Sequence, residues 1–119
     1  GISLKQCADN YERKILEHVK TVKNLPSFDL VLLGMGLDGH IASLFPNTKA
    51  LNENEALIVL NEIPQLNTQR ITMTYALLMN SKKIVMLIKG QEKKKVLIDS
   101  LTNNLPVSVL IPKLDLILN

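Results

Sequence analysis

The chain has 119 residues, which suits one domain rather than two, because a single hydrophobic core usually comprises roughly 100–200 residues. Hydrophobic residues make up 46% of it and charged residues 21%, a usage that excludes disordered, collagen-like and low-complexity proteins. The net charge of +3 is too small to require a nucleic acid, and the few aromatic side chains are scattered rather than interleaved with basic ones. We therefore expect a folded chain with no nucleic-acid partner.

The cysteine content and the apolar runs bear on where the protein works. Cys7 is the only cysteine and forms no internal disulfide, which favours a reducing compartment. No basic segment followed by an apolar stretch and a small-residue cleavage site is present, and no apolar run approaches the roughly 20 residues of a membrane span. The sequence predicts a cytoplasmic protein without a membrane partner.

The N-terminal part of the chain predicts a helix followed by a buried strand. Ser3 and Gln6 have the spacing of a capping box, and apolar residues then recur at three- and four-residue intervals, which predicts an amphipathic helix over residues 4–22. Pro26 and its polar neighbours end that helix, and residues 28–33 form an apolar run of strand length that leads into a glycine-rich loop.

The remaining elements alternate between strands and helices. In chain order, they are strand 57–60, closed near Pro64, strand 70–74, helix 75–81, strand 84–88, helix 91–101 and short strands 107–111 and 116–118. Such alternation is typical of the α/β class, and we expect a mostly parallel, Rossmann-like sheet covered by helices.

In open α/β sheets, ligands bind beyond the carboxyl ends of the strands. Three segments of this chain follow or end a predicted strand and carry residues suited to chemistry. They are residues 34–40, 70–74 and 90–93. We expect the functional site where these segments meet.

The first of these segments has three interpretations. Gly34, Gly36 and Gly39 fit the G-x-G-x-x-G pattern of dinucleotide sites, but that pattern needs a substantial helix opening at its third glycine, and Pro46 leaves room for barely two turns. Alternatively, the three glycines allow positive φ and a close substrate approach, and His40 presents an imidazole as a general base. A plain structural histidine that caps a short helix is a third possibility.

Residues 28–46 resemble the signature of 6-phosphogluconolactonases, within the wider glucosamine-6-phosphate isomerase/deaminase superfamily. The Arg70-Ile71-Thr72-Met73-Thr74 segment is similar to the R-[IV]-T-x-T strand of that family, and Gly90-Gln91-Glu92-Lys93 is similar to its G-x-x-K turn before a helix. The order and rough spacing of the three segments agree with the family.

The resemblance covers only the second half of the family's domain. Its members are roughly twice as long, and their first half carries a Gly-Gly-Ser/Thr phosphate loop and an Asp-Glu-Arg motif, neither of which occurs here. We therefore expect residues 1–119 to be the C-terminal part of one lactonase-like domain. The family includes fusions to glucose-6-phosphate dehydrogenase, which leaves open a covalent fusion to such a domain.

The resemblance implies hydrolysis of a phosphosugar lactone, 6-phosphoglucono-δ-lactone, with His40 as the general base and acid. Asp38 either orients the imidazole or forms an Asx turn, and backbone N–H groups of residues 34–39 are candidate donors to the oxyanion. The chemistry needs neither an organic cofactor nor a metal, and Cys7, His18 and His40 form no metal-ligand pattern.

The substrate's phosphate requires fixed positive charge. Arg70, at the head of a strand, has a planar guanidinium suited to phosphate, although a surface ion pair is its commoner use. Lys93 lies in the first turn of a predicted helix, where a cation is unfavourable unless an anion is bound nearby. With Gly34, Gly36 and Gly39, these two residues are the predicted substrate-binding set.

Two other functions compete with lactone hydrolysis. Deaminases of the superfamily continue the histidine motif as Phe-Asn-Glu-Pro, whereas this chain has Ser43-Leu44-Phe45-Pro46, so Phe45 stands where a deaminase has a carboxylate. A catalytically silent phosphosugar-binding domain is the second alternative. Because half of the family's domain is missing, we also expect the isolated chain to be nearly inactive and to self-associate through an exposed sheet edge.

Overall fold

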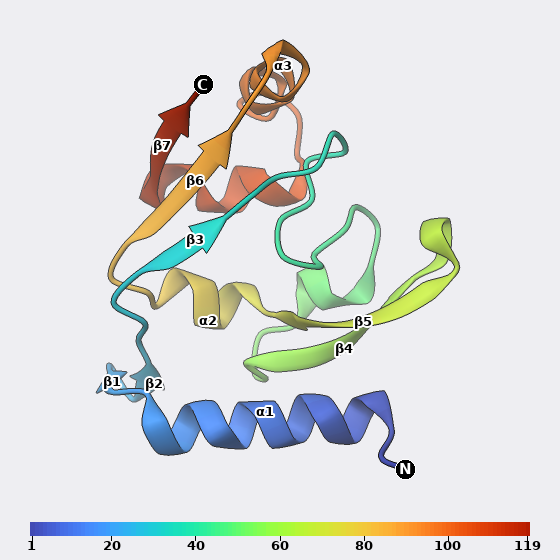
Figure 1. Ribbon diagram of the computed structural model, residues 1–119, viewed down its shortest axis with the longest axis vertical. Coiled ribbons are helices and arrows are strands. Elements are labelled where there is room, and N and C mark those ends of the chain that lie inside the picture. The colour runs from blue at the N-terminus through green and yellow to red at the C-terminus, as the bar shows by residue number, and fades with distance from the viewer.

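The computed structural model describes residues 1–119, and its larger sheet consists of three parallel strands (Figure 1). They are β3 (Val31–Leu33), β6 (Ile84–Ile88) and β7 (Leu114–Leu118), in the order β3-β6-β7. Leu33 pairs with Met86, so the loops that follow β3 and β6 leave the same edge of the sheet. The α/β class and the predicted strands near 28–33, 84–88 and 116–118 are confirmed.

The second sheet is an antiparallel hairpin, which adds to the mostly parallel arrangement that the sequence predicts. Strands β4 (Ile58–Ile63) and β5 (Thr68–Met73) pair only with each other. The connection is one turn of 3₁₀ helix, Pro64–Leu66, followed by Asn67 in the left-handed conformation with φ 48°. A connection this short can only reverse the chain, because a parallel crossover needs about a dozen residues.

Helix α1 (Leu4–His18) begins as the sequence predicts. The backbone N–H of Ser3 donates to Gln6 Oε1 at 2.8 Å, and the N–H of Gln6 donates to Ser3 Oγ at 3.2 Å, which completes the capping box. The helix lies along the hairpin (Figure 1), and the carboxylate of Glu12 accepts N–H bonds from Leu57 and Ile58 at the start of β4. The two elements are therefore held together by polar as well as apolar contacts.

Helix α1 ends at His18, short of the predicted end at residue 22. Lys23 and Asn24 adopt positive φ, 56° and 68°, and reverse the chain tightly. The residues before the turn include β-branched side chains, which favour extended backbone over helix. The result is a small hairpin of β1 (Thr21–Val22) and β2 (Leu25–Pro26).

Two further helices appear where the sequence predicts them, and one predicted strand does not exist. Helices α2 (Tyr75–Met79) and α3 (Gln91–Asp99) follow β5 and β6. Residues 107–111, predicted as a strand, instead belong to the 3₁₀ segment Pro106–Lys113. Proline at both ends of this apolar run explains the difference, since Pro106 and Pro112 cannot donate to a strand ladder.

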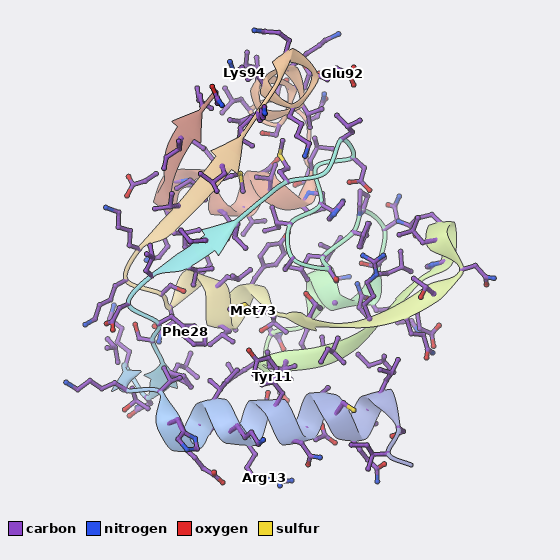
Figure 2. The ribbon with its side chains drawn as sticks, viewed as in Figure 1. Tyr11, Arg13, Phe28, Met73, Glu92 and Lys94 are labelled. Carbon is purple, nitrogen blue, oxygen red and sulfur yellow. The ribbon has the colours of Figure 1, made fainter.

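The core consists of two apolar clusters, one under the parallel sheet and one between α1 and the hairpin. Phe28 and Met73 contact both clusters and lie between them (Figure 2). The opposite face of the parallel sheet is uncovered, with Leu32, Leu87 and Ile117 exposed by 63%, 52% and 53%. None of the helices combines the length and the apolar character that crossing a membrane requires.

Candidate active site

Two of the three predicted segments meet at the edge of the parallel sheet. Residues 34–40 follow β3, residues 90–93 follow β6, and the pairing of these strands places His40 and Lys93 on one cavity of about 520 Å³. We call it the His40 cavity, and it is lined by Leu32, Leu33, Gly34, Met35, Gly36, His40, Ala42 and Lys93. The expectation that residues 70–74 end a strand at the same edge is wrong, because they belong to the hairpin.

Asp38 and His40 form a hydrogen-bonded pair. One carboxylate oxygen, Oδ1, accepts hydrogen bonds from His40 Nδ1 at 2.6 Å and from the His40 backbone N–H at 3.0 Å. The first bond orients the imidazole and the second closes a local turn, so Asp38 makes both of the contacts that the sequence offered as alternatives. Burial alone would raise the pKa of Asp38, but the hydrogen bonds and the charge of His40 hold it below its usual value. The carboxylate is therefore ionised at neutral pH.

This pairing determines which nitrogen of His40 is available for chemistry. An ionised carboxylate only accepts hydrogen bonds, so Nδ1 carries the hydrogen, and the neutral ring keeps its lone pair on Nε2. Nε2 has no hydrogen-bond partner within the molecule, and the His40 side chain is partly exposed on the cavity. The ring is thus fixed at one nitrogen and free to accept a proton at the other.

The three glycines of the loop serve different purposes, and the expectation of positive φ holds only for Gly39, at 81°. A Cβ on Gly36 would lie 2.2 Å from the imidazole of His40, so the missing side chain makes room for the ring. A Cβ on Gly34 would meet no atom within 4 Å, so Gly34 is under neither constraint. Only Gly36 is thus required by the position of the histidine itself.

Part of the backbone N–H set expected to face the oxyanion is already engaged. Gly36 donates to the His40 carbonyl and Gly39 to the Gly36 carbonyl, both at 3.0 Å. Met35 and Ala42 also line the cavity, and their N–H groups have no acceptor in the molecule. The donors left for an oxyanion therefore include Met35 and Ala42 and exclude Gly36 and Gly39.

The sequence indicates Phe45 only as the residue that stands where a deaminase has a carboxylate, and the structure places its ring against His40. Its ring stacks on the imidazole of His40, with centroids 4.0 Å apart and planes inclined by 19°. The guanidinium carbon of Arg70 lies 5.5 Å from the centroid of the same ring. Arg70 is exposed, forms no ion pair and does not line the His40 cavity, so Phe45 is what connects it to His40.

Polar side chains of the hairpin hold the segment that carries Phe45. Asn61 donates to the Ser43 carbonyl at 2.9 Å and to Thr48 Oγ1 at 3.0 Å, and Thr72 Oγ1 accepts the Ser43 N–H at 3.0 Å. Thr48 in turn donates to the Phe45 carbonyl at 2.7 Å. The sequence indicates Thr72 through the Arg70–Thr74 motif, whereas Asn61 is only a polar residue next to an apolar predicted strand.

Neither a dinucleotide-type helix nor a metal-ligand cluster accompanies the glycine loop. After Gly39 the backbone forms turns as far as residue 48, so no helix opens at the third glycine as a dinucleotide site requires. No group of three or more histidine, cysteine, aspartate or glutamate side chains is close enough together to hold a metal ion.

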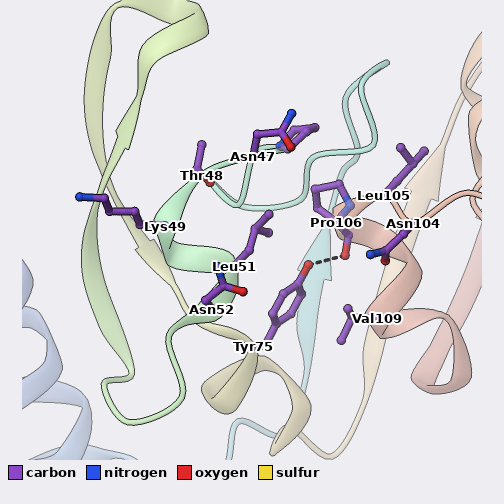
Figure 3. Close-up of a pocket in the computed structure, with 11 residues that line it drawn as sticks. Asn47, Thr48, Lys49, Leu51, Asn52, Tyr75, Asn104, Leu105, Pro106 and Val109 are labelled. Carbon is purple, nitrogen blue, oxygen red and sulfur yellow. Dashed lines mark hydrogen bonds between the residues drawn. The ribbon is translucent and has the colours of Figure 1, made fainter.

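A second hollow, of about 590 Å³, lies between residues 46–52 and 104–109 (Figure 3). We call it the Tyr75 hollow. The Tyr75 hydroxyl donates to the Pro106 carbonyl at 2.6 Å, and burial raises its pKa to about 12. None of the predicted site residues lines this hollow.

Comparison with known proteins identifies the class to which this fold and site belong. The family model described as "Glucosamine-6-phosphate isomerases/6-phosphogluconolactonase" matches residues 2–117. The chain belongs to this family, as its motifs predict.

Individual relatives give a consistent result. The chain is 45% identical over 84 residues to the 6-phosphogluconolactonase of Chlamydia muridarum, a match that covers 71% of this chain and 31% of that protein. It is 46% identical over 70 residues, 59% of this chain and 9% of the relative, to the GDH/6PGL endoplasmic bifunctional protein of Oryctolagus cuniculus. The crystal structure of 6-phosphogluconolactonase from Leishmania guyanensis superposes with a TM-score of 0.80 at 30% identity, covering 97% of this chain and 50% of that one. The chain thus spans half or less of the length of these proteins.

Proposed function

We propose that the chain carries the histidine side of a lactonase site, which hydrolyses 6-phosphoglucono-δ-lactone to 6-phosphogluconate in the oxidative pentose phosphate pathway. The observation that carries the proposal is the Asp38–His40 pair at 2.6 Å, with Nε2 of His40 free beside a cavity that Lys93 shares. The names of the relatives in Chlamydia muridarum and Leishmania guyanensis agree with it.

The proposed reaction needs one proton carrier. Water attacks the lactone carbonyl carbon while Nε2 of His40 takes its proton, and Asp38 stabilises the resulting imidazolium through the Nδ1 hydrogen bond. When the oxyanion collapses, the bond from the carbonyl carbon to the ring oxygen breaks, and the imidazolium returns the proton to that oxygen. The free N–H groups of Met35 and Ala42, two residues that line the cavity, are candidate donors to the oxyanion.

We propose that Lys93 and Arg70 bind the phosphate. Lys93 is half-buried in the first turn of α3, where a cation is unfavourable unless an anion offsets the helix dipole, and it lines the same cavity as His40. Arg70 reaches the site from the hairpin through its contact with Phe45. The two cations thus approach the substrate from different elements.

Phe45 favours lactone hydrolysis over deaminase or isomerase chemistry. Its ring occupies the neighbourhood of His40 at a centroid distance of 4.0 Å and can neither give nor take a proton. Ring opening and hydrogen transfer in an amino sugar need a second acid–base group, whereas a lactone needs only one. The only carboxylate hydrogen-bonded to His40 is that of Asp38, which occupies Nδ1.

We further propose that these residues are one part of a larger domain. The uncovered apolar face of the sheet, with Leu32, Leu87 and Ile117, and the free edge of β3 are surfaces that a second part of the domain would cover. Fusion to a glucose-6-phosphate dehydrogenase domain is compatible with the rabbit relative. The single cysteine supports a cytoplasmic location.

Substitution of His40 tests the catalytic proposal. In the full-length protein that contains this chain, we expect His40→Ala to lower kcat for the lactone by at least about 10²-fold, after subtraction of spontaneous hydrolysis. His18→Ala is the matched control, because His18 lies on the exposed side of α1 and should leave kcat unchanged. A His40→Ala variant within about threefold of the parent would remove His40 from the mechanism.

The isolated chain tests the domain proposal. Residues 1–119 alone should show only trace lactonase activity and should self-associate in light scattering, because the apolar sheet face is open to water. A monodisperse monomer with full lactonase activity would show that no further part of the domain is needed.

A further inference from the structure

We infer that Phe45 is a positioning residue that fixes the imidazole plane of His40 and sets its spacing from Arg70. The inference rests on the proposed lactonase function and concerns a residue that takes no part in proton transfer. The ring of Phe45 contacts both groups. Its centroid lies 4.0 Å from that of His40, the proposed proton carrier, and 5.5 Å from the guanidinium carbon of Arg70, which is proposed to bind the phosphate.

The stacking on Phe45 restrains the tilt of the imidazole plane, which the other neighbours of His40 leave free. Asp38 holds Nδ1 of the ring through one hydrogen bond. A single hydrogen bond still allows the imidazole plane to tilt about the Cβ–Cγ bond of His40. Gly36 only provides the space that the ring occupies. The aromatic face of Phe45, inclined by 19° to the imidazole, limits that rotation and so determines where Nε2 points.

Phe45 can do this because it is itself firmly held. Its side chain is 3% exposed, and its carbonyl accepts from the buried Thr48, which Asn61 ties to the hairpin. By contrast, His40 is partly exposed and Arg70 is exposed. The buried ring is therefore the fixed member of the three, and the two exposed groups take their positions from it.

The spacing between His40 and Arg70 matters because a lactone bound by its phosphate must present its carbonyl carbon to Nε2. A misplacement of about 1 Å between a binding group and a catalytic group can lower the rate roughly 10²-fold. A ring in contact with both groups ties the position of one to that of the other. Loss of the ring should therefore change kcat and KM together.

The test compares Phe45→Leu, Phe45→Tyr and the matched control Phe28→Leu in the full-length protein. Phe45→Leu removes the ring while keeping an apolar side chain, and we expect kcat to fall about tenfold and KM to rise. Phe45→Tyr keeps the ring face and should stay within about threefold of the parent. Phe28→Leu removes a core ring that does not stack on His40 and should leave kcat unchanged. Circular dichroism melting curves confirm that each variant is folded.

A spectroscopic readout separates this inference from the lactonase proposal. In protein labelled at histidine, the ring current of Phe45 shifts the carbon-bound protons of His40, and Phe45→Leu should abolish that shift while His18 stays unchanged. This result supports the contact even if His40→Ala proves to have no effect on lactone hydrolysis. Unchanged His40 signals and an unchanged kcat in folded Phe45→Leu would overturn the inference. If Phe45→Leu fails to fold, a kcat loss in Phe45→Tyr equal to that of His40→Ala would also overturn it.

Discussion

The His40 cavity and the Tyr75 hollow differ in chemistry far more than in size. Their volumes are about 520 and 590 Å³, so the larger hollow is the one without any predicted site residue. The Tyr75 hollow holds a hydroxyl already bonded to a carbonyl, whereas the His40 cavity holds an imidazole nitrogen without a partner and a lysine in a first helical turn. The proposed reaction is therefore assigned to the His40 cavity because of its unsatisfied, converging polar groups and not because of its volume.

If the His40 cavity, and not the Tyr75 hollow, is the reaction site, the largest loss of kcat is expected at Gly36. In the full-length protein, Gly36→Ala places a Cβ where the imidazole of His40 lies, so the ring must leave Asp38 or the loop must shift. We expect kcat for the lactone to fall about 10²-fold. Gly34→Ala, which meets no neighbouring atom, should cost much less. Equal kcat losses in both variants would show that the loop, rather than the place of the ring, is sensitive.

The next effect sharpens the assignment of the cations. Lys93→Ala should raise KM for the phosphorylated lactone by roughly 10- to 100-fold, the equivalent of one charge-assisted hydrogen bond, and should leave an unphosphorylated lactone unaffected. Arg70→Ala should raise KM less, because Arg70 is exposed and outside the cavity. Lys95→Ala, an exposed neighbour on α3, is the control. Equal losses on both lactones would point to a general disturbance of the fold.

The smallest effect concerns the Tyr75 hollow and should appear in stability alone. Tyr75→Phe removes the bond to Pro106 and should lower the free energy of unfolding by about 1 kcal/mol, with lactonase kcat unchanged. Urea unfolding measures this change, and exposed Tyr11→Phe is the control. A loss of kcat in Tyr75→Phe would place function in this hollow as well.

The stability that Tyr75 contributes should fall with rising pH, and Tyr75→Phe tests this direction. The pKa of Tyr75 is raised by burial to about 12, above its ordinary value of about 10. Its contribution to stability is therefore fully present below pH 10 and is lost as the pH rises toward 12. Tyr75→Phe should flatten the fall in stability over this range, and an unchanged slope would contradict the assignment.

The local parts of the candidate site could be predicted from sequence. Asp38 and His40 are two residues apart, so their contact depends only on the conformation of the loop that contains them. The glycines in the sequence predict that loop. The capping box of Ser3 and Gln6 formed for the same reason. Lys93 could be placed near His40 because the loops that follow parallel strands leave the same edge of a sheet, a topological rule rather than a local one.

The hairpin and its consequences required the tertiary structure. Nothing in the local pattern of residues 70–74 distinguishes a strand of the parallel sheet from a strand that folds back on β4, and only the pairing with residues 58–63 decides it. That pairing brings Arg70 to Phe45 and sets Thr72 and Asn61 beside the loop that carries His40. The sequence by itself therefore determined which residues could react, because reactivity resides in side-chain type and short spacing. The packing of two separate sheets decided how those residues are held, because the contacts that link Arg70, Thr72 and Asn61 to the loop of His40 join segments that are distant along the chain.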